Sequence, residues 1–214
     1  MANHPFLVSF RFQARLLAGM KQNVAILVFD DVEVLDFAGP FEVFAVTDEL
    51  RGYDTFNTFT VATKPGTVRA RNGLKVVPDH TCESCPAPDI LVIPGGFGTR
   101  ALLREPSLIE WIQVKSRKAE IVMSVCTGAF LLAKAGLLDG LRATTHHECL
   151  DTLRELAPAA TVDPTARFHD NGHILTAAGI SAGIDCSLHV VRRLLGPETA
   201  AATIRYMEYR EPTA

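Results

Sequence analysis

The sequence predicts an α/β fold in which helices pack on a mostly parallel sheet. Three observations support this prediction. Short apolar runs of strand length alternate with longer segments whose composition favours helices. The run at residues 24–29 (VAILVF) contains no polar residue, as expected for a parallel strand that is buried on both faces. Hydrophobic residues make up 48% of the chain, which is enough for the core that such a fold requires.

The remaining elements can be placed in order along the chain. After the first strand, Asp36 begins a helix, with Pro40 expected in its first turn. Asn171-Gly172 is a strong hairpin signal between two strands. The other predicted strands are residues 56–62, 90–94, 120–125, 142–145, 167–170 and 173–177. The other predicted helices are residues 106–118, 148–157, 183–195 and 197–209. Because no repeat or linker interrupts this series, we expect a single domain over residues 23–210.

Residues 1–22 differ from the rest of the chain. This segment contains Arg11 and Arg15 but no acidic residue, and its apolar runs are too broken for a secretory signal. Two explanations stay open: a weak organelle-targeting segment, or an extension upstream of a natural start at Met20. In either case we expect residues 1–22 to be a disordered leader that lies outside the domain.

The composition argues against several classes of partner. A net charge of −3 and a pI near 6.2 disfavour nucleic acid and acidic membranes, because both require a basic surface. No apolar run approaches the ~20 residues that span a bilayer. The five cysteines are irregularly spaced and odd in number, which indicates a reducing compartment rather than a disulfide framework. We therefore expect a cytoplasmic protein that binds neither nucleic acid nor membrane.

The pentapeptide at residues 124–128 (SVCTG) is the strongest functional signal in the chain. An apolar strand leads into it and a helix-forming run leads out, which is the layout of a nucleophile elbow with Cys126 as the nucleophile. A sulfur at a helix N-terminus is favoured as thiolate. The alternative, with about equal weight, is a buried cysteine that acts as a small hydrophobic side chain.

Three segments should meet at the carboxyl edge of the sheet. Asp36 follows the first strand, although an acidic residue there is also a common helix cap. The glycines of residues 94–98 (PGGFG) follow a central strand, where their N–H groups can approach a ligand, or where they form only a tight turn. Cys126 and Thr127 follow the next strand. Ligands bind at this edge in such folds, so the three segments together favour a functional site.

These motifs together resemble the ThiJ/PfpI superfamily. The resemblance runs from about Val24 to Tyr209 and implies a flavodoxin-like three-layer sandwich, as in class I glutamine amidotransferases. It is most specific for the isocyanide hydratases and the ligand domains of certain AraC-type regulators. The motifs that carry it are 35–40 (LDFAGP), 93–96 (IPGG), 124–128 (SVCTG), 143–146 (ATTH) and 179–185 (GISAGID).

Departures from the family patterns narrow the choice of branch. Protease-like members carry His directly after the nucleophile, whereas this chain has Thr127 there. Glyoxalase-type members carry Glu near the cysteine, whereas this chain has Asp36. His147 stands where the hydratases carry Trp, and Phe97 replaces a smaller residue of the glycine loop, so both should reshape the pocket. The resemblance also implies a homodimer. Since the chain stops soon after Tyr209, we expect no DNA-reading module.

The hydratase resemblance implies catalytic roles for Cys126, Asp36 and Thr127. The thiolate of Cys126 would attack the terminal carbon of an isocyanide to give a thioimidate, and the product would be an N-substituted formamide. Asp36, with a pKa raised by burial, would act as general acid and then as base. The N–H groups of Gly96 and Thr127 would stabilise negative charge, and the Thr127 hydroxyl would bind the sulfur or Asp36.

The substrate implied by the resemblance is a small electrophile, with no metal or cofactor. Gly95, Gly96, Phe97 and His146 are the candidate substrate-binding residues, although His146 is also compatible with a structural role. Two further functions stay open: an oxidant or electrophile sensor that uses Cys126, and a glyoxalase or deglycase.

Several other polar residues are expected to be structural. Cys82 and Cys85 form a C-x-x-C pattern without a second pair, which favours a surface loop over a zinc or redox site. Asp185 is expected to cap a helix or to support the elbow turn. Cys149 and Cys186 are expected to fill the core.

Overall fold

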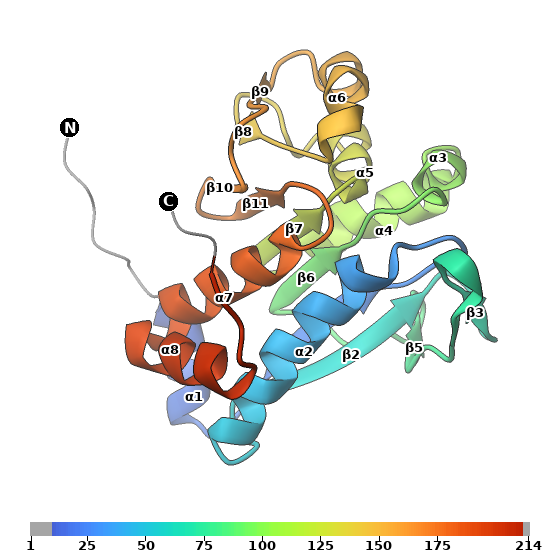
Figure 1. The fold of residues 1–214 in the computed structure, drawn as a ribbon. Helices are drawn as coiled ribbons and strands as arrows, with labels where there is room; N and C mark the ends of the chain where they lie inside the picture. Colours follow the sequence, from blue (N-terminus) through green and yellow to red (C-terminus); the bar gives the residue numbers. More distant parts are fainter. Residues whose placement is uncertain (1–9, 212–214) are drawn as a thin grey trace.

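Figure 1 shows the computed structural model, which describes residues 10–211. Within these residues a seven-stranded sheet has the order β10-β11-β7-β6-β1-β2-β5. Every pairing in this sheet is parallel except that of β10 with β11. Its strands are β1 (Gln22–Leu27), β2 (Phe56–Ala62), β5 (His80–Thr81), β6 (Ile90–Ile93), β7 (Ile121–Val125), β10 (Phe168–Asp170) and β11 (Ile174–Ala177).

Helices cover both faces of the sheet and make the predicted flavodoxin-like, three-layer α/β sandwich (Figure 1). On one face lie α2 (Val34–Leu50), α7 (Ala182–Leu195) and α8 (Pro197–Tyr206), and on the other lie α4 (Pro106–Ser116) and α5 (Gly128–Lys134). The other elements are α1 (Phe10–Leu17), α3 (Thr99–Leu102), α6 (Leu150–Leu156), η1 (Arg71–Gly73), η2 (His147–Cys149), and the pairs β3 (Val68–Arg69) with β4 (Lys75–Val76) and β8 (Arg142–Ala143) with β9 (Thr161–Val162).

The centre of the sheet is apolar because helices cover both of its faces. Strands β6 and β7 are buried along their whole length, and β1 is buried except at Asn23. These three strands are neighbours and run in the same direction, so their carboxyl ends lie at one edge of the sheet. The segments that come directly after them carry Asp36, the glycine loop and Cys126.

Residues 10–22 correct the expected leader. They form α1 and the start of β1, and Phe12 is only 1% exposed. Its ring lies 6.4 Å from that of Phe56, which also packs against Phe44 of α2. Arg15 pairs with the buried Asp89 at 3.2 Å. Leu16 of the same helix also packs against the core. Residues 1–9 lie outside the described part of the chain.

Three predicted boundaries also differ from the structure. Helix α2 begins at Val34, so Pro40 lies inside the helix rather than in its first turn. Its missing N–H leaves the carbonyl of Asp36 without the usual helical hydrogen bond. The strand expected at residues 142–145 is the two-residue β8, which pairs with β9 outside the main sheet. The helix expected at residues 148–157 is the turn η2 followed by α6.

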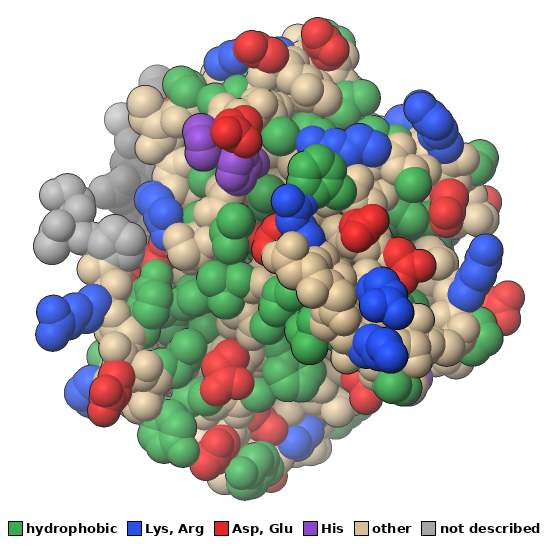
Figure 2. All heavy atoms as spheres, turned by 45° about the vertical axis from the view of Figure 1, so that its right-hand side comes forward, with side chains coloured by type: hydrophobic (Ala, Val, Ile, Leu, Met, Phe, Trp, Pro, Cys, Tyr) green, Lys and Arg blue, Asp and Glu red, His purple; other side chains and the backbone are tan. Residues whose placement is uncertain are grey.

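Acidic and basic side chains are mixed on the face of the molecule that Figure 2 presents, with hydrophobic side chains between them. This distribution agrees with the small net charge of the chain. In the described residues, no helix combines the length and apolar character required to cross a bilayer.

Candidate active site

A sharp corner between β7 and α5 presents Cys126. Its φ of +54° is one that L-residues rarely adopt, and it turns the chain from the strand into the helix within two residues. The N–H of Cys126 donates to the carbonyls of Ala177 and Ala178, and the hydroxyl of Thr145 donates to its carbonyl at 2.8 Å. The strand, corner and helix predicted around this cysteine are therefore present, and the corner is fixed from both sides.

The surroundings of the Cys126 sulfur favour the thiol over the thiolate, which is opposite to the direction expected from its place at a helix N-terminus. Burial raises its pKa to about 12, and the nearby Asp36 carboxyl contributes to the rise. The N–H groups of Thr127 and Ile180 point at the sulfur and lower the pKa, but their effect is smaller than that of burial. The short helix α5 cannot offset the loss of water around a side chain that is 6% exposed.

Asp36 holds the second titratable group of the site. It has no exposed surface, and its Oδ2 accepts a hydrogen bond of 3.0 Å from the N–H of Gly95. It does not cap its own helix, whose N-cap is Glu33. Burial raises the pKa of Asp36 to about 7, and Glu33 adds to the rise, while Gly95 and the Cys126 thiol lower it. Oδ1 is buried and has no hydrogen bond of regular geometry among residues 10–211, and the side-chain partner of the carboxyl is the thiol of Cys126.

The glycine loop is hydrogen-bonded to Thr127, which differs from two predicted contacts. The N–H of Gly96 donates to Oγ1 of Thr127 at 2.9 Å, and that hydroxyl lies 3.2 Å from the Gly96 carbonyl. The Gly96 N–H is thus occupied rather than free to stabilise charge, and the Thr127 hydroxyl contacts neither the sulfur nor Asp36. A Cβ on Gly95 would lie 2.5 Å from the nitrogen of Thr127 and 2.9 Å from Oδ2 of Asp36, so glycine is required there.

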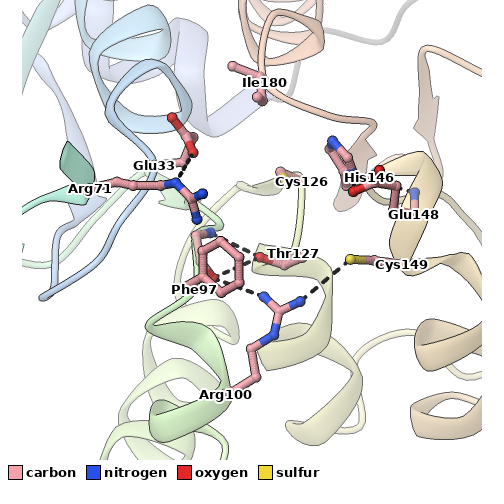
Figure 3. Close-up of a pocket in the computed structure, with 11 residues that line it drawn as sticks. Glu33, Arg71, Phe97, Arg100, Cys126, Thr127, His146, Glu148, Cys149 and Ile180 are labelled. Atoms are coloured by element: carbon pink, nitrogen blue, oxygen red, sulfur yellow. Dashed lines mark hydrogen bonds and ion pairs between the residues drawn. The ribbon is translucent and has the colours of Figure 1, made fainter.

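A cavity of about 220 Å³ opens over Cys126 and Thr127 (Figure 3). Gly96, Phe97 and His146 line it, as expected for a substrate site, whereas Gly95 lies beneath it against Asp36. His146 is half-buried, packs on Gly179, and accepts a hydrogen bond of 3.3 Å from the N–H of Glu148. The structure thus brings the glycine loop, the elbow and His146 to one cavity.

A comparison with known protein families identifies the family to which the chain with this site belongs. The model of the DJ-1/PfpI family matches residues 22–193, which include every site residue described above. The chain belongs to the DJ-1/PfpI family.

Individual relatives point to two kinds of protein within this family. The isonitrile hydratase of Pseudomonas putida is 33% identical over 190 residues, which cover 89% of this chain and 79% of that protein. The HTH-type transcriptional regulator GbdR of Pseudomonas aeruginosa (strain UCBPP-PA14) is 31% identical over 85% of this chain, which spans only 49% of the regulator. A ThiJ/PfpI family protein from Pseudomonas syringae has a similar structure, with a TM-score of 0.80, 30% identity, and coverage of 90% of this chain and 77% of that one.

The site of this DJ-1/PfpI family member also contains several residues that we did not predict from the sequence. Ile180 lies after β11, has a φ of +50°, and directs its N–H to the sulfur. Its signal was present in the motif at residues 179–185, which carries the family resemblance. Glu33, Arg71 and Arg100 also line the cavity, but they come from the N-cap of α2, from η1 and from α3, whose approach only the fold reveals.

Two of the residues predicted to be structural, Cys149 and Asp185, differ from their predicted roles. Cys149 was expected in the core, but it is half-buried in the cavity wall, where Arg100 donates to its sulfur at 3.6 Å. Asp185 forms an ion pair with Arg167 and accepts a 2.7 Å hydrogen bond from the hydroxyl of Tyr209, so it neither caps a helix nor supports the elbow. In the described part of the chain, no three His, Cys, Asp or Glu side chains gather in a way that could hold a metal ion.

Proposed function

We propose that this protein is an enzyme that hydrates small isocyanides to N-substituted formamides. The observation that carries the proposal is the pairing of the Cys126 thiol with a buried carboxyl, Asp36, whose pKa lies at about 7. A carboxyl with such a pKa can both accept and return a proton at neutral pH. Similarity to an isonitrile hydratase supports the choice of substrate class.

Because Cys126 starts as a thiol, the first step must remove its proton. At neutral pH, ionised Asp36 takes the proton of Cys126 as the sulfur bonds to the terminal carbon of R–N≡C. Asp36 then gives that proton to the same carbon, which leaves the thioimidate R–N=CH–S. No free thiolate accumulates, and the N–H groups of Thr127 and Ile180 stabilise the charge on sulfur while the proton moves.

Water completes the reaction. It adds to the thioimidate carbon with Asp36 as the base, the C–S bond breaks, and one proton of the water passes to nitrogen while the other restores the thiol. The product is R–NH–CHO, and atoms balance with one water consumed. The Oδ1 atom of Asp36, which lacks a regular hydrogen bond among residues 10–211, is the position from which these transfers are possible.

The test is to incubate the purified protein with an alkyl isocyanide and to monitor the formamide by NMR. Wild-type protein should produce it, whereas Cys126→Ser and Cys126→Ala should reduce the rate to background. Cys186→Ser is the matched control, because this thiol is also buried but lies outside the cavity. Formamide produced by Cys126→Ala at the wild-type rate would rule out the mechanism.

An oxidant sensor is a weaker candidate function. A buried thiol with a pKa raised to about 12 is a poor peroxide sensor, because the thiolate is the reactive form. Similarity to a transcriptional regulator makes ligand binding without turnover the main alternative, and absence of formamide together with saturable binding would favour it. Glyoxalase activity can be assayed with the same preparation. A homodimer and a cytoplasmic location stay predictions.

A further inference from the structure

Two arginines enter the cavity and differ in their partners. Arg71 forms an ion pair with Glu33, with 3.5 Å between Nε and the carboxylate. Arg100 donates only to uncharged acceptors: the carbonyl of Gly96 at 3.2 Å, the hydroxyl of Thr99 at 3.4 Å and the sulfur of Cys149 at 3.6 Å. Over residues 10–211, no carboxylate lies within ion-pair distance of Arg100.

Aromatic rings hold this guanidinium in place. It lies 5.4 Å from the centre of the Phe97 ring and 5.5 Å from that of Phe130, and the face of Phe97 also stacks on Arg71 at 3.9 Å. Figure 3 shows Arg100 below the Phe97 ring, with its guanidinium directed toward Thr127 and Cys149. These contacts restrict an otherwise exposed side chain, so it loses less conformational freedom when it binds a ligand.

The other charges of the cavity wall do not neutralise Arg100. Glu33 pairs with Arg71. Glu148 lies 4.0 Å from each of His146 and His147, and its side chain is 76% exposed, so it faces water. Figure 3 shows Glu148 beside His146. Arg100 is thus an exposed cation on the lining of the cavity that holds Cys126, and it has no carboxylate partner among residues 10–211.

We propose that the cavity selects small substrates with a carboxylate or a similar planar anion, and that Arg100 is the specificity-determining residue. This inference rests on the proposed function for one point only, namely that the substrate carries an isocyanide. The anion site is argued from Arg100 and does not depend on that function. A guanidinium offers five N–H donors and binds a carboxylate through two parallel hydrogen bonds. A cavity of about 220 Å³ holds roughly seven water-sized groups, which suits a molecule as small as isocyanoacetate.

The first experiment compares isocyanoacetate with isocyanoacetamide, which has nearly the same shape but no charge. Wild-type protein should show a kcat/KM for the anion that is roughly tenfold above that for the amide, because a charge-assisted pair is worth more than a neutral hydrogen bond. Arg100→Met should lose this preference. Arg104→Met should keep it, because Arg104 is exposed like Arg100 but lies outside the cavity.

A second experiment does not depend on turnover. Iodoacetate and iodoacetamide alkylate a thiol by the same displacement, in which sulfur bonds to the methylene carbon and iodide leaves. The ratio of their rates at Cys126, measured by mass spectrometry of its peptide, should fall roughly tenfold in Arg100→Met relative to wild type and Arg104→Met. Because an unfolded fraction would react with the ratio of a free cysteine, the urea unfolding of each variant is measured alongside, and only variants that are folded at the assay conditions are compared. Arg100→Gln, which retains an N–H donor for Gly96, should show the same fall.

The two experiments separate the two proposals. If no isocyanide is hydrated but the alkylation ratio still depends on Arg100, the hydratase proposal fails and the anion site stands. If neutral isocyanides are hydrated but the ratio is the same in wild type and both Arg100 variants, the anion site is wrong and the hydratase proposal stands. An equal fall of the alkylation ratio in Arg104→Met would also overturn the anion-site proposal. The ratio would then depend on the total positive charge of the surface and not on Arg100.

Discussion

Replacement of Asp36 by Asn should stabilise the protein while it removes the proposed proton carrier. The carboxyl has no exposed surface, and one of its oxygens lacks a regular hydrogen bond among residues 10–211. An ionised group in that position has lost its water without full compensation. Asn can still accept the hydrogen bond from the N–H of Gly95. The substitution therefore removes a buried charge and preserves the main contact.

The size of the effect can be worked out from the pKa of Asp36. Its rise from an ordinary value of 3.8 to about 7 corresponds to about 4 kcal/mol, at about 1.4 kcal/mol per pH unit. The folded state binds this proton more tightly than the unfolded state. The stability that it contributes is thus fully present below pH 3.8 and is lost as the pH rises through about 7. Wild type and Asp36→Asn should be similar at acidic pH and diverge as the pH rises.

Urea unfolding at several pH values measures this divergence. Between pH 5 and pH 8, the advantage of Asp36→Asn in free energy of unfolding should grow by about 3 kcal/mol and then level off. Asp54→Asn is the control, because this carboxyl is exposed, and its curve should run parallel to that of wild type. A difference between wild type and Asp36→Asn that stays constant with pH would mean that the carboxyl is ordinary, and the proton transfer would lose its basis.

Two further predictions concern the scaffold. Phe12→Ala should lower the free energy of unfolding by about 3–5 kcal/mol in a urea titration, since it removes a side chain that is 1% exposed and packs on Phe56. Leu17→Ala in the same helix should change it little, because Leu17 is 90% exposed; equal effects would mean that α1 does not join the core. Thr127→Val should cost about 1–3 kcal/mol and lower kcat, because it leaves the buried N–H of Gly96 without its acceptor. Thr127→Ser should restore both quantities, and a fully stable Thr127→Val would show that this contact matters little.

The sequence was sufficient for the sheet and for the convergence of the site segments. Apolar runs at β1, β6 and β7 identify strands that are buried on both faces, and parallel neighbours bring the segments at their carboxyl ends to one edge. The elbow could also be predicted, because a strand and a helix flank a single small-residue corner at Cys126. These predictions succeed since they depend on local pattern and on the direction of neighbouring strands.

Features that depend on three-dimensional packing could not be predicted. The pKa of Cys126 depends on how much water the surrounding side chains exclude, and a motif gives no measure of that burial. Thr127 binds Gly96 because the two loops approach at a distance that only the assembled sheet fixes. The contrast between Arg71 and Arg100 likewise depends on where Glu33 lies after folding.

The pH dependence of kcat/KM for a neutral alkyl isocyanide tests most directly whether Asp36 takes the proton of Cys126. If it does, the rate rises with pH, passes an inflection near pH 7 where the carboxyl ionises, and then becomes constant. A rate that instead climbs about tenfold per pH unit through neutrality, with no inflection below the pKa of the thiol at about 12, would show that free thiolate is required. Asp36 would then have no part in the transfer.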